Sequence, residues 1–385
     1  MKNNTVMIKN ALVFIFILSA LACSKQNMDI KKESAQDYSE FENRLTDNQS
    51  IQQRLDHYKV PGASVAIFEN GEIVWRKEYG VLRANSDELV NSSSKFQAAS
   101  ISKAVAALGV IKLVEQYNLN IDTDINLYLK NWKVDYSQYN SEKVTIRRLL
   151  SHTAGINVPG LYGYSKSSSI PSALDILNGK GNNEKVQIEI KPGTKFLYSG
   201  GGYSILEQLV EDVSGTRFNE YLKKEVFEPL EMTNSSYDLF PKENVSSAHD
   251  VKGVEHAEGW LLYPEQAAAG LWSTTSDLVK FSVALENSYH NVKDSLISSA
   301  YAQEMFNPEV EYINGIWWGL GVALKGEGQD VTFWHAGSNP GGYRCILIDF
   351  YKKKTGIVIM TNSDNGGALY NEILESFLNY KGIKF

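Results

Sequence analysis

Apolar residues recur at helical spacing in several parts of this chain. A polar stretch at residues 91–95 is followed by an apolar stripe every three or four positions, formed by Ile101, Ala104, Val105, Leu108 and Ile111. The same period marks residues 47–59, 203–213 and 369–380. Such spacing places apolar side chains on one face of a helix. We therefore predict that residues from 100 to about 285 are mainly helical or loop-like, and that a helix closes the chain.

Strand-like runs lie near both ends of the sequence. Residues 64–68 and 73–76 flank Asn70-Gly71, a pair typical of a two-residue hairpin because both central residues take positive φ. Further runs near the C-terminus predict a meander at residues 319–324, 331–335, 343–351 and 356–361. Strands at both ends with helices between predict an α/β fold of the α+β type, in which helices flank an antiparallel sheet and a helical lobe is inserted. We expect a ligand between sheet and lobe.

The beginning of the chain has the pattern of an export signal. In residues 1–22, Lys2 and Lys9 form a positive start, and the apolar run that follows from Ala11 to Ala22 is too short to span a membrane. Cys23 follows Ala20-Leu21-Ala22, and a cysteine at this point predicts a lipoprotein whose thiol carries the lipid anchor. Ala20 stands where such sequences usually have leucine, so plain secretion is the alternative.

These patterns divide the chain into a signal peptide at residues 1–22, the anchor cysteine and a polar tether at 23–45, and one domain at 46–385. Within the domain, residues 46–90 and 315–385 form the sheet lobe and 91–314 the helical lobe. The formal charge of −7 gives no sign of a nucleic-acid surface. Cys345 is the only other cysteine, so a lipidated Cys23 leaves no disulfide within the chain.

Candidate chemistry begins with Ser100-Ile101-Ser102-Lys103. At the start of a helix, positions i and i+3 lie on one side, so the Lys103 amine comes beside the Ser100 hydroxyl. An amine that is kept neutral can take the proton of a serine nucleophile. The alternative is that Ser100 is an ordinary helix N-cap.

Two later stretches matter for this choice. Lys195 to Tyr203 contains Tyr198-Ser199 and three glycines, which we expect to form a tight loop. The Tyr198 phenol can act as an acid or base if a cation lowers its pKa, and the alternative is a half-buried loop aromatic. Residues 334–342 contain His335-Ala336-Gly337-Ser338 at a strand end. Such a strand can offer a backbone N–H to a reacting carbonyl, and the alternative is a strand that ends in a turn.

Taken together, these stretches resemble the serine β-lactamase and penicillin-recognising family, most closely its class C, D-alanyl-D-alanine carboxypeptidase and esterase branch. The resemblance covers nearly all of residues 46–385. It rests on these matching segments: Val60-Pro61-Gly62-Ala63, Ser100-Ile101-Ser102-Lys103, Leu149-Leu150-Ser151-His152-Thr153-Ala154-Gly155, Tyr198-Ser199-Gly200, Ala269-Gly270-Leu271-Trp272-Ser273 and His335-Ala336-Gly337.

The resemblance implies roles for particular residues. Ser100 would form an acyl-enzyme, and Lys103 and Tyr198 would share the proton relay, with the division between them open. The backbone N–H groups of Ser100 and Ser338 would bind the oxyanion. His335 would hold Tyr198 if neutral, or favour its phenolate if protonated, and Gly337 keeps the path to the nucleophile clear.

Departures from the family pattern narrow the function. Gly200 stands where the family has an asparagine that binds the substrate amide, and His335 replaces a permanent cation that binds a carboxylate. Arg344 can substitute for that cation or be a surface charge. We interpret His152 as structural. The aromatic residues of 157–169 either line a pocket or cover the core.

The sequence therefore predicts an exported serine hydrolase, esterase or D-amino-acid peptidase-like, that acts on an ester or a small or peptide-like amide. The alternatives are a β-lactamase and a penicillin-binding sensor or cell-wall binding module that acylates without efficient turnover. No metal or cofactor is implied. The expected partners are a small or peptide-like acyl substrate, which can derive from the cell wall, and a bacterial membrane at the periplasmic or outer cell surface.

Overall fold

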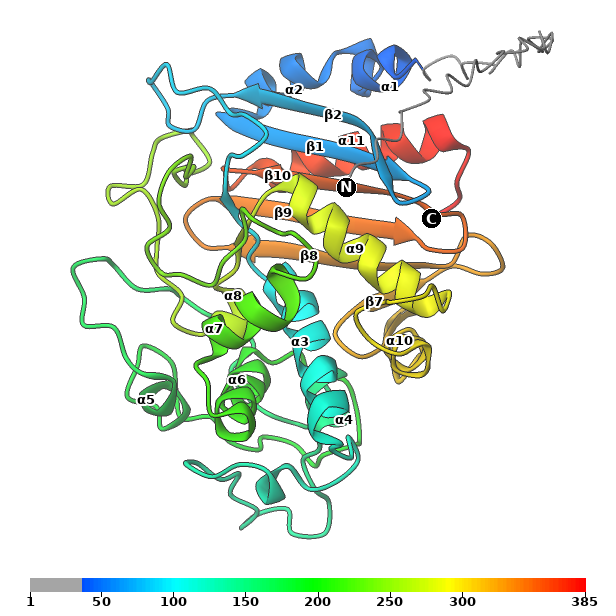
Figure 1. Ribbon diagram of the computed structural model, residues 1–385. Coiled ribbons are helices and arrows are strands. Elements are labelled where there is room, and N and C mark those ends of the chain that lie inside the picture. Colours follow the sequence, from blue (N-terminus) through cyan, green and yellow to red (C-terminus); the bar gives the residue numbers. More distant parts are fainter. Residues whose placement is uncertain (1–36) are drawn as a thin grey trace, which may run out of the picture. The chain divides into compact units, whose positions relative to one another are not determined.

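An antiparallel sheet of eight strands is assembled from both ends of the chain (Figure 1). The computed structural model describes residues 37–385; the predicted signal peptide, Cys23 and most of the predicted tether lie outside them. In their spatial order the strands are β2 Glu72–Gly80, β1 Gly62–Glu69, β10 Thr355–Thr361, β9 Tyr343–Phe350, β8 Thr332–Asn339, β7 Ala323–Lys325, β6 Ile316–Trp318 and β5 Val310–Ile313.

Helices cover the sheet and form the region below it. They are α1 Ser39–Asn43, α2 Ile51–Tyr58, α3 Ile101–Tyr117, α4 Ile146–Leu150, α5 Ala173–Leu177, α6 Gly200–Ser214, α7 Phe218–Leu222, α8 Gln266–Ala269, α9 Thr275–Tyr289, α10 Ser299–Met305 and α11 Gly366–Lys381. Short 3₁₀ helices are η1 Thr46–Asn48 and η2 Ile125–Leu127, and η3 Lys223–Phe227 is a π-helix. β3 Phe96–Gln97 pairs with β4 Trp272–Ser273. The predicted fold class is confirmed.

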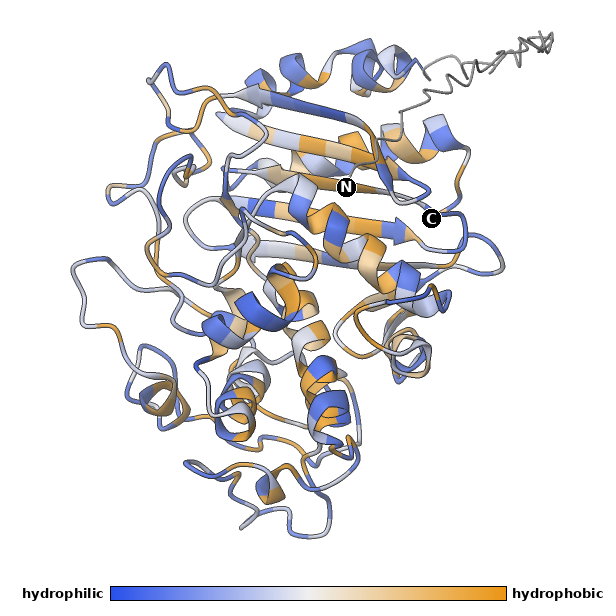
Figure 2. Ribbon diagram, in the orientation of Figure 1, coloured by the Kyte–Doolittle hydropathy of each residue, from blue (hydrophilic) through white to orange (hydrophobic). Residues whose placement is uncertain are grey.

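The sheet separates two apolar cores because side chains alternate along each strand. Val65 and Ile67 of β1 pack with α2 and α11 on one face, whereas Ala66 and Phe68 pack with α9 on the other. Figure 1 shows α9 crossing one face and α11 behind the opposite face. In Figure 2 the central strands β9 and β10 are more apolar than the edge strand β2. Their near-continuous burial confirms the predicted C-terminal strands.

The N-terminal hairpin is confirmed. Asn70 has φ 50° and Gly71 φ 86° between β1 and β2, as the Asn-Gly pair predicts. β1 also pairs with β10, which places Val65 opposite Ile359 and joins the N-terminal hairpin to the C-terminal strands in one sheet.

Several elements differ from the sequence prediction. The predicted strand at 319–324 begins only at Ala323, because Gly319 is pressed against the backbone of Met305 and Gly321 takes φ +90°. β5 and β6 are short and were not predicted. β5 and α9 both lie with the sheet, although they fall within the predicted helical lobe of residues 91–314. Within residues 37–385, no helix has the length and apolarity needed to cross a bilayer.

Candidate active site

Ser100 stands at the first turn of the buried helix α3. Ala99, just before it, has φ +49°, a left-handed conformation that is costly for a residue with a side chain and is often found at functional sites. The hydrogen bond from Ala98 N to Leu271 O, 2.8 Å, ties this turn to the strand pair of β3 and β4. The Ser100 side chain makes no capping hydrogen bond. Ser100 is therefore the N-cap residue of α3 by position only, and its hydroxyl is left available for chemistry.

Lys103 lies one turn further along α3. Its Nζ is 3.3 Å from Ser100 Oγ and donates to Ala268 O at 2.7 Å. The side chain is 2% exposed. Burial lowers the pKa of the Lys103 amine from 10.5 to about 7, because the charged form loses its hydration. A large share of these amines is thus neutral at neutral pH and able to accept a proton.

The Tyr198 phenol reaches the same place from the segment before α6. The Ser100 side chain lies near enough to the phenol to lower its pKa, and the ring centroid of Tyr198 is 5.0 Å from Lys103 Nζ. Burial raises the pKa of Tyr198 and outweighs the opposite effect of the Ser100 side chain. The condition set from the sequence, that a cation lowers this pKa, is therefore not met. The phenol keeps its proton and is a donor.

The glycines after Tyr198 form the first turn of α6 instead of the expected loop. Ser199 caps this helix by accepting from Gly202 N at 2.8 Å, and it donates to Asn157 O at 2.6 Å. A Cβ at Gly200 would meet Leu161 Cγ at 3.3 Å. An apolar side chain therefore lies against the position that carries the family's asparagine.

Strand β8 runs close beside the nucleophile turn. A Cβ on Gly337 would lie 2.3 Å from Ala98 O, so only glycine allows this approach. Ser338 follows and is exposed, while Asn339 Nδ2 donates to Gln97 Oε1 at 2.7 Å and ties β8 to β3. The role of the Ser338 N–H in an oxyanion hole stays a prediction.

His335 is a buried, neutral histidine on β8. Its Nδ1 lies 2.8 Å from Ala336 O, which can only accept, so Nδ1 carries the proton and Nε2 is bare. Burial, and less strongly the charge of Lys103, lower the pKa of His335 to about 3. Among the described residues, Nε2 has no hydrogen-bond partner. This site therefore lacks the permanent cation of the family pattern.

Arg344 does not fill that gap. Its guanidinium pairs with Asp364 Oδ1 at 2.7 Å and donates to Asn339 O at 2.8 Å. It therefore fastens the end of β8 to β9 as a paired charge on the strand, with its side chain 21% exposed.

His152 was interpreted as structural, but the structure places it directly behind Tyr198. Their ring centroids are 4.3 Å apart, and His152 is 2% exposed. Trp318, on the unpredicted strand β6, contacts both His152 and His335. The segment Leu149 to Gly155 could be recognised in the sequence by its resemblance to the family. Nothing in its spacing, however, predicted that His152 contacts Tyr198.

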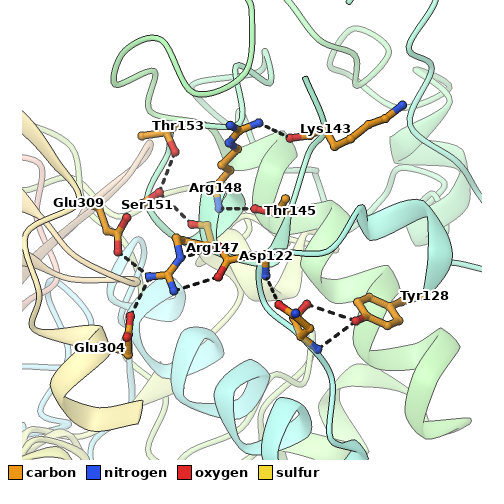
Figure 3. A network of polar contacts seen from close by, with 11 residues as sticks. Asp122, Tyr128, Lys143, Thr145, Arg147, Arg148, Ser151, Thr153, Glu304 and Glu309 are labelled. Atoms are coloured by element: carbon orange, nitrogen blue, oxygen red, sulfur yellow. Dashed lines mark hydrogen bonds and ion pairs between the residues drawn. The ribbon is translucent and has the colours of Figure 1, made fainter. Parts of the chain in front are cut away.

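The turn that carries His152 is anchored by a polar network at α4 (Figure 3). Arg147 pairs with Asp122, Glu304 and Glu309 at 2.7–2.8 Å. Ser151 Oγ, next to His152, donates to Arg147 O at 2.8 Å. Thr145 caps α4 as its sequence position suggests.

The aromatic residues of the loop at 157–169 differ in burial: Tyr164 fits the alternative that they cover the core, and the pocket-lining alternative stays a prediction. Tyr164 is buried and its hydroxyl accepts from Asn182 N at 2.9 Å, whereas Tyr162 is 68% exposed. Cys345 is a buried free thiol in β9. In the part of the chain that the structure describes, no group of histidine, cysteine or acidic residues is suited to hold a metal ion.

Comparisons with known proteins agree with this geometry. The sequence profile of the family described as Beta-lactamase matches residues 48–375. Protein flp of Staphylococcus aureus (strain MRSA252) is 28% identical over 233 residues, 59% of this chain and 44% of that protein. The putative penicillin-binding protein PbpX of Bacillus subtilis (strain 168) is 25% identical over 356 residues, 91% of this chain and 83% of that protein.

Solved structures show the same fold. The octameric penicillin-binding protein homologue from Pyrococcus abyssi superposes with a TM-score of 0.70 at 24% identity, over 86% of this chain and 76% of that one. The chain spans less than half the length of the Flp protein that it matches. Since the family profile matches most of its residues, this chain belongs to the beta-lactamase family, with the serine hydrolase fold of the penicillin-binding proteins.

Proposed function

We propose that this chain is a serine hydrolase that forms an acyl-enzyme on Ser100 and acts on esters or on small, peptide-like amides. The observation that supports this most is the convergence of one buried amine, one phenol and one serine hydroxyl that makes no capping bond. Lys103 Nζ is 3.3 Å from Ser100 Oγ and 5.0 Å from the ring centroid of Tyr198, and the Ser100 side chain acts on the pKa of the phenol. A structural serine requires neither partner.

The pKa directions support a division of the proton relay. The low pKa of Lys103 makes it the base that takes the Ser100 proton as Oγ attacks the substrate carbonyl. The high pKa of Tyr198 makes its phenol the acid that protonates the leaving alkoxide or amine. The proton on Lys103 then restores the phenol. Water releases the acyl group by the reverse transfers, and the backbone N–H groups of Ser100 and Ser338 stabilise the oxyanion.

The surroundings of the relay favour substrates without a carboxylate near the scissile bond. His335 is neutral, and Arg344 is already paired with Asp364. Leu161 lies against Gly200, where an amide group would bind an acylamino substituent. A neutral ester fits this set of contacts better than a penicillin, which carries both groups.

A penicillin-binding module that is acylated but releases the acyl group slowly is the second candidate. It is favoured by the similarity to the putative penicillin-binding protein PbpX. The same relay would serve its acylation. The two functions differ in the rate of deacylation.

The test compares turnover with stable labelling. Purified protein is incubated with p-nitrophenyl acetate and butyrate, D-amino-acid peptides, a chromogenic cephalosporin and a fluorescent penicillin. We expect ester turnover to exceed cephalosporin turnover, and Ser100→Ala to abolish both. Stable penicillin labelling without ester turnover would favour the binding module. Activity retained by Ser100→Ala would contradict both candidates.

We also propose that the protein is exported and carries a lipid on Cys23. The support is the sequence pattern of residues 1–23. Cells fed a radioactive fatty acid should label the wild-type protein but not Cys23→Ser. Equal labelling of the two proteins would rule out this anchor.

A further inference from the structure

His152 lies at the junction of the two aromatic rings that flank the Lys103 amine. Lys103 Nζ is 5.0 Å from the ring centroid of Tyr198 and 5.7 Å from that of Tyr203. The His152 ring packs on both phenols, with centroid distances of 4.3 Å and 5.3 Å. A substitution of His152 therefore affects the surroundings of both the proposed base, Lys103, and the proposed acid, Tyr198.

The tautomer of His152 follows from its hydrogen bond. Its Nδ1 accepts the backbone N–H of Ser199 at 3.1 Å, so Nδ1 carries no proton. Burial, and then the charges of Lys103 and His335, keep its pKa well below the usual value. The ring is thus neutral with its proton on Nε2. Ser199 is the neighbour of Tyr198, so this bond fixes the segment that carries the phenol.

The backbone at His152 is also unusual. Its φ of +57° is in the left-handed region, which costs energy for a histidine and persists only where the surroundings impose it. The Arg147 network and the Ser151 hydrogen bonds hold this turn (Figure 3). The turn thus directs the ring inward, against Tyr198.

We propose, on the basis of the proposed function, that His152 is a positioning residue of the relay. It fixes the rings of Tyr198 and Tyr203 against the Lys103 amine and excludes water from that amine. It does not itself transfer the proton. The titratable groups that face it are Lys103 on α3, His335 on β8, and the phenols of Tyr198 and Tyr203.

The test uses a variant that keeps the fold of the turn. Asparagine tolerates the left-handed backbone, and its Oδ1 can replace Nδ1 as acceptor for Ser199 N–H, but it removes the ring. We expect His152→Asn to lower kcat for the best ester about tenfold to a hundredfold, as small misplacements of catalytic groups do, with little change in KM. The rise of kcat/KM with pH should also move to higher pH, because water reaches Lys103.

His290→Asn is the matched control. Like His152, His290 bonds the backbone and packs on a tyrosine, but its bond is to a carbonyl, Tyr351 O at 2.9 Å, and its tyrosine is Tyr289 at the end of α9. It should keep the wild-type kcat and pH profile. Thermal unfolding of both variants separates a loss of fold from a loss of positioning.

A second readout does not depend on turnover. In protein labelled with ¹³C-lysine, the NMR titration of Lys103, assigned with Lys103→Arg, should show a higher pKa in His152→Asn than in wild type. An unchanged Lys103 pKa together with wild-type kcat would overturn the role of His152. If wild type hydrolyses nothing, the proposed function fails, while the titration still decides whether His152 controls the amine.

Discussion

At the scale of single residues, the site depends on burying an amine. The Lys103 side chain is almost fully enclosed, and its hydrogen bonds to Ala268 O and Ser100 Oγ compensate in part for its lost hydration. Placing a group that prefers water inside the protein costs stability. The same burial supplies the neutral base that a serine nucleophile needs.

The first prediction concerns the pH dependence of activity. Since only the neutral Lys103 amine accepts the Ser100 proton, kcat/KM for an ester should rise with pH through about 7, the pKa of Lys103. His335, with a pKa of about 3, should contribute nothing in this range. A profile measured from pH 5 to 9 checks this. A rate that is flat across pH 7 would argue against Lys103 as the base.

The second prediction concerns stability. Lys103 has a lower pKa in the folded protein, about 7, than its ordinary value of 10.5. Between these values the unfolded chain binds one more proton, so folding stability rises with pH by about 1.4 kcal/mol per pH unit from this group.

Lys103→Met removes this dependence. The variant should therefore be more stable than wild type near pH 7, with a difference that shrinks toward pH 10. Urea unfolding at several pH values measures it. A constant difference between the two proteins would show that Lys103 titrates normally.

At the scale of elements, the site requires β8 to touch the start of α3. Gly337 makes this contact possible because it has no Cβ. A Cβ there would lie 2.3 Å from Ala98 O and 2.5 Å from Cys345 Sγ. Backbone atoms cannot move aside as the end of a flexible side chain can. The separation of the strand and the nucleophile turn is therefore set by one missing methyl group.

The third prediction tests this contact. Gly337→Ala should destabilise the fold by roughly 2–3 kcal/mol through overpacking and lower kcat strongly, because the strand shifts away from Ser100. Gly367→Ala in α11 is the control: a Cβ there meets nothing within 4 Å. It should be as stable as wild type or slightly more so. Equal stability and equal kcat in the two variants would show that β8 can shift to accommodate the added methyl group.

Elements with a strong local signal could be predicted from the sequence. The Asn70-Gly71 hairpin, α2 and the closing helix follow from turn chemistry and apolar periods. β5 and β6 could not, because each is three or four residues long and is fixed by pairing with its neighbour. The glycines at 200–202 were predicted to form a loop, but they begin α6. This helix start is stabilised by packing against Leu161 and Asn157 and by the Ser199 cap, and the first two contacts come from residues far away in the sequence.

At the scale of the molecule, the two ends of the chain hold the sheet together. Arg54 of α2 forms a bidentate pair with Glu372 of α11 at 2.6–2.7 Å, and Tyr58 donates to the same carboxylate. The two charged side chains are 7% and 14% exposed. A pair so well enclosed leaves an uncompensated charge if one member is removed.

The fourth prediction follows. Glu372→Gln should lower the free energy of unfolding by roughly 2–3 kcal/mol at pH 7 without changing kcat. Burial raises the pKa of Glu372, but the bonds from Arg54 and Tyr58 outweigh it and hold the pKa below 4.5. The stability from this carboxylate is therefore present above 4.5 and is lost as the pH falls further, so the two proteins should converge in acid. A difference that persists in acid would contradict this origin.

The site could be predicted only in part from the sequence. Ser100 and Lys103 are neighbours on one helix, and their contact follows from helical geometry. The meeting of Tyr198 with them was implied only by the resemblance, because the fold brings together segments separated by almost a hundred residues. The pKa directions, the neutral state of His335 and the place of His152 depend on burial, which no local pattern reveals.

The central claim is that Ser100 forms the covalent intermediate with Lys103 and Tyr198 as its partners. Acid quenching during ester turnover, followed by intact mass and peptide mapping, tests it directly. We predict a single acyl adduct on the peptide that contains Ser100, absent in Ser100→Ala and formed much more slowly in Lys103→Met and Tyr198→Phe. An adduct on another residue, or an unchanged rate of formation in both partner variants, would contradict the account.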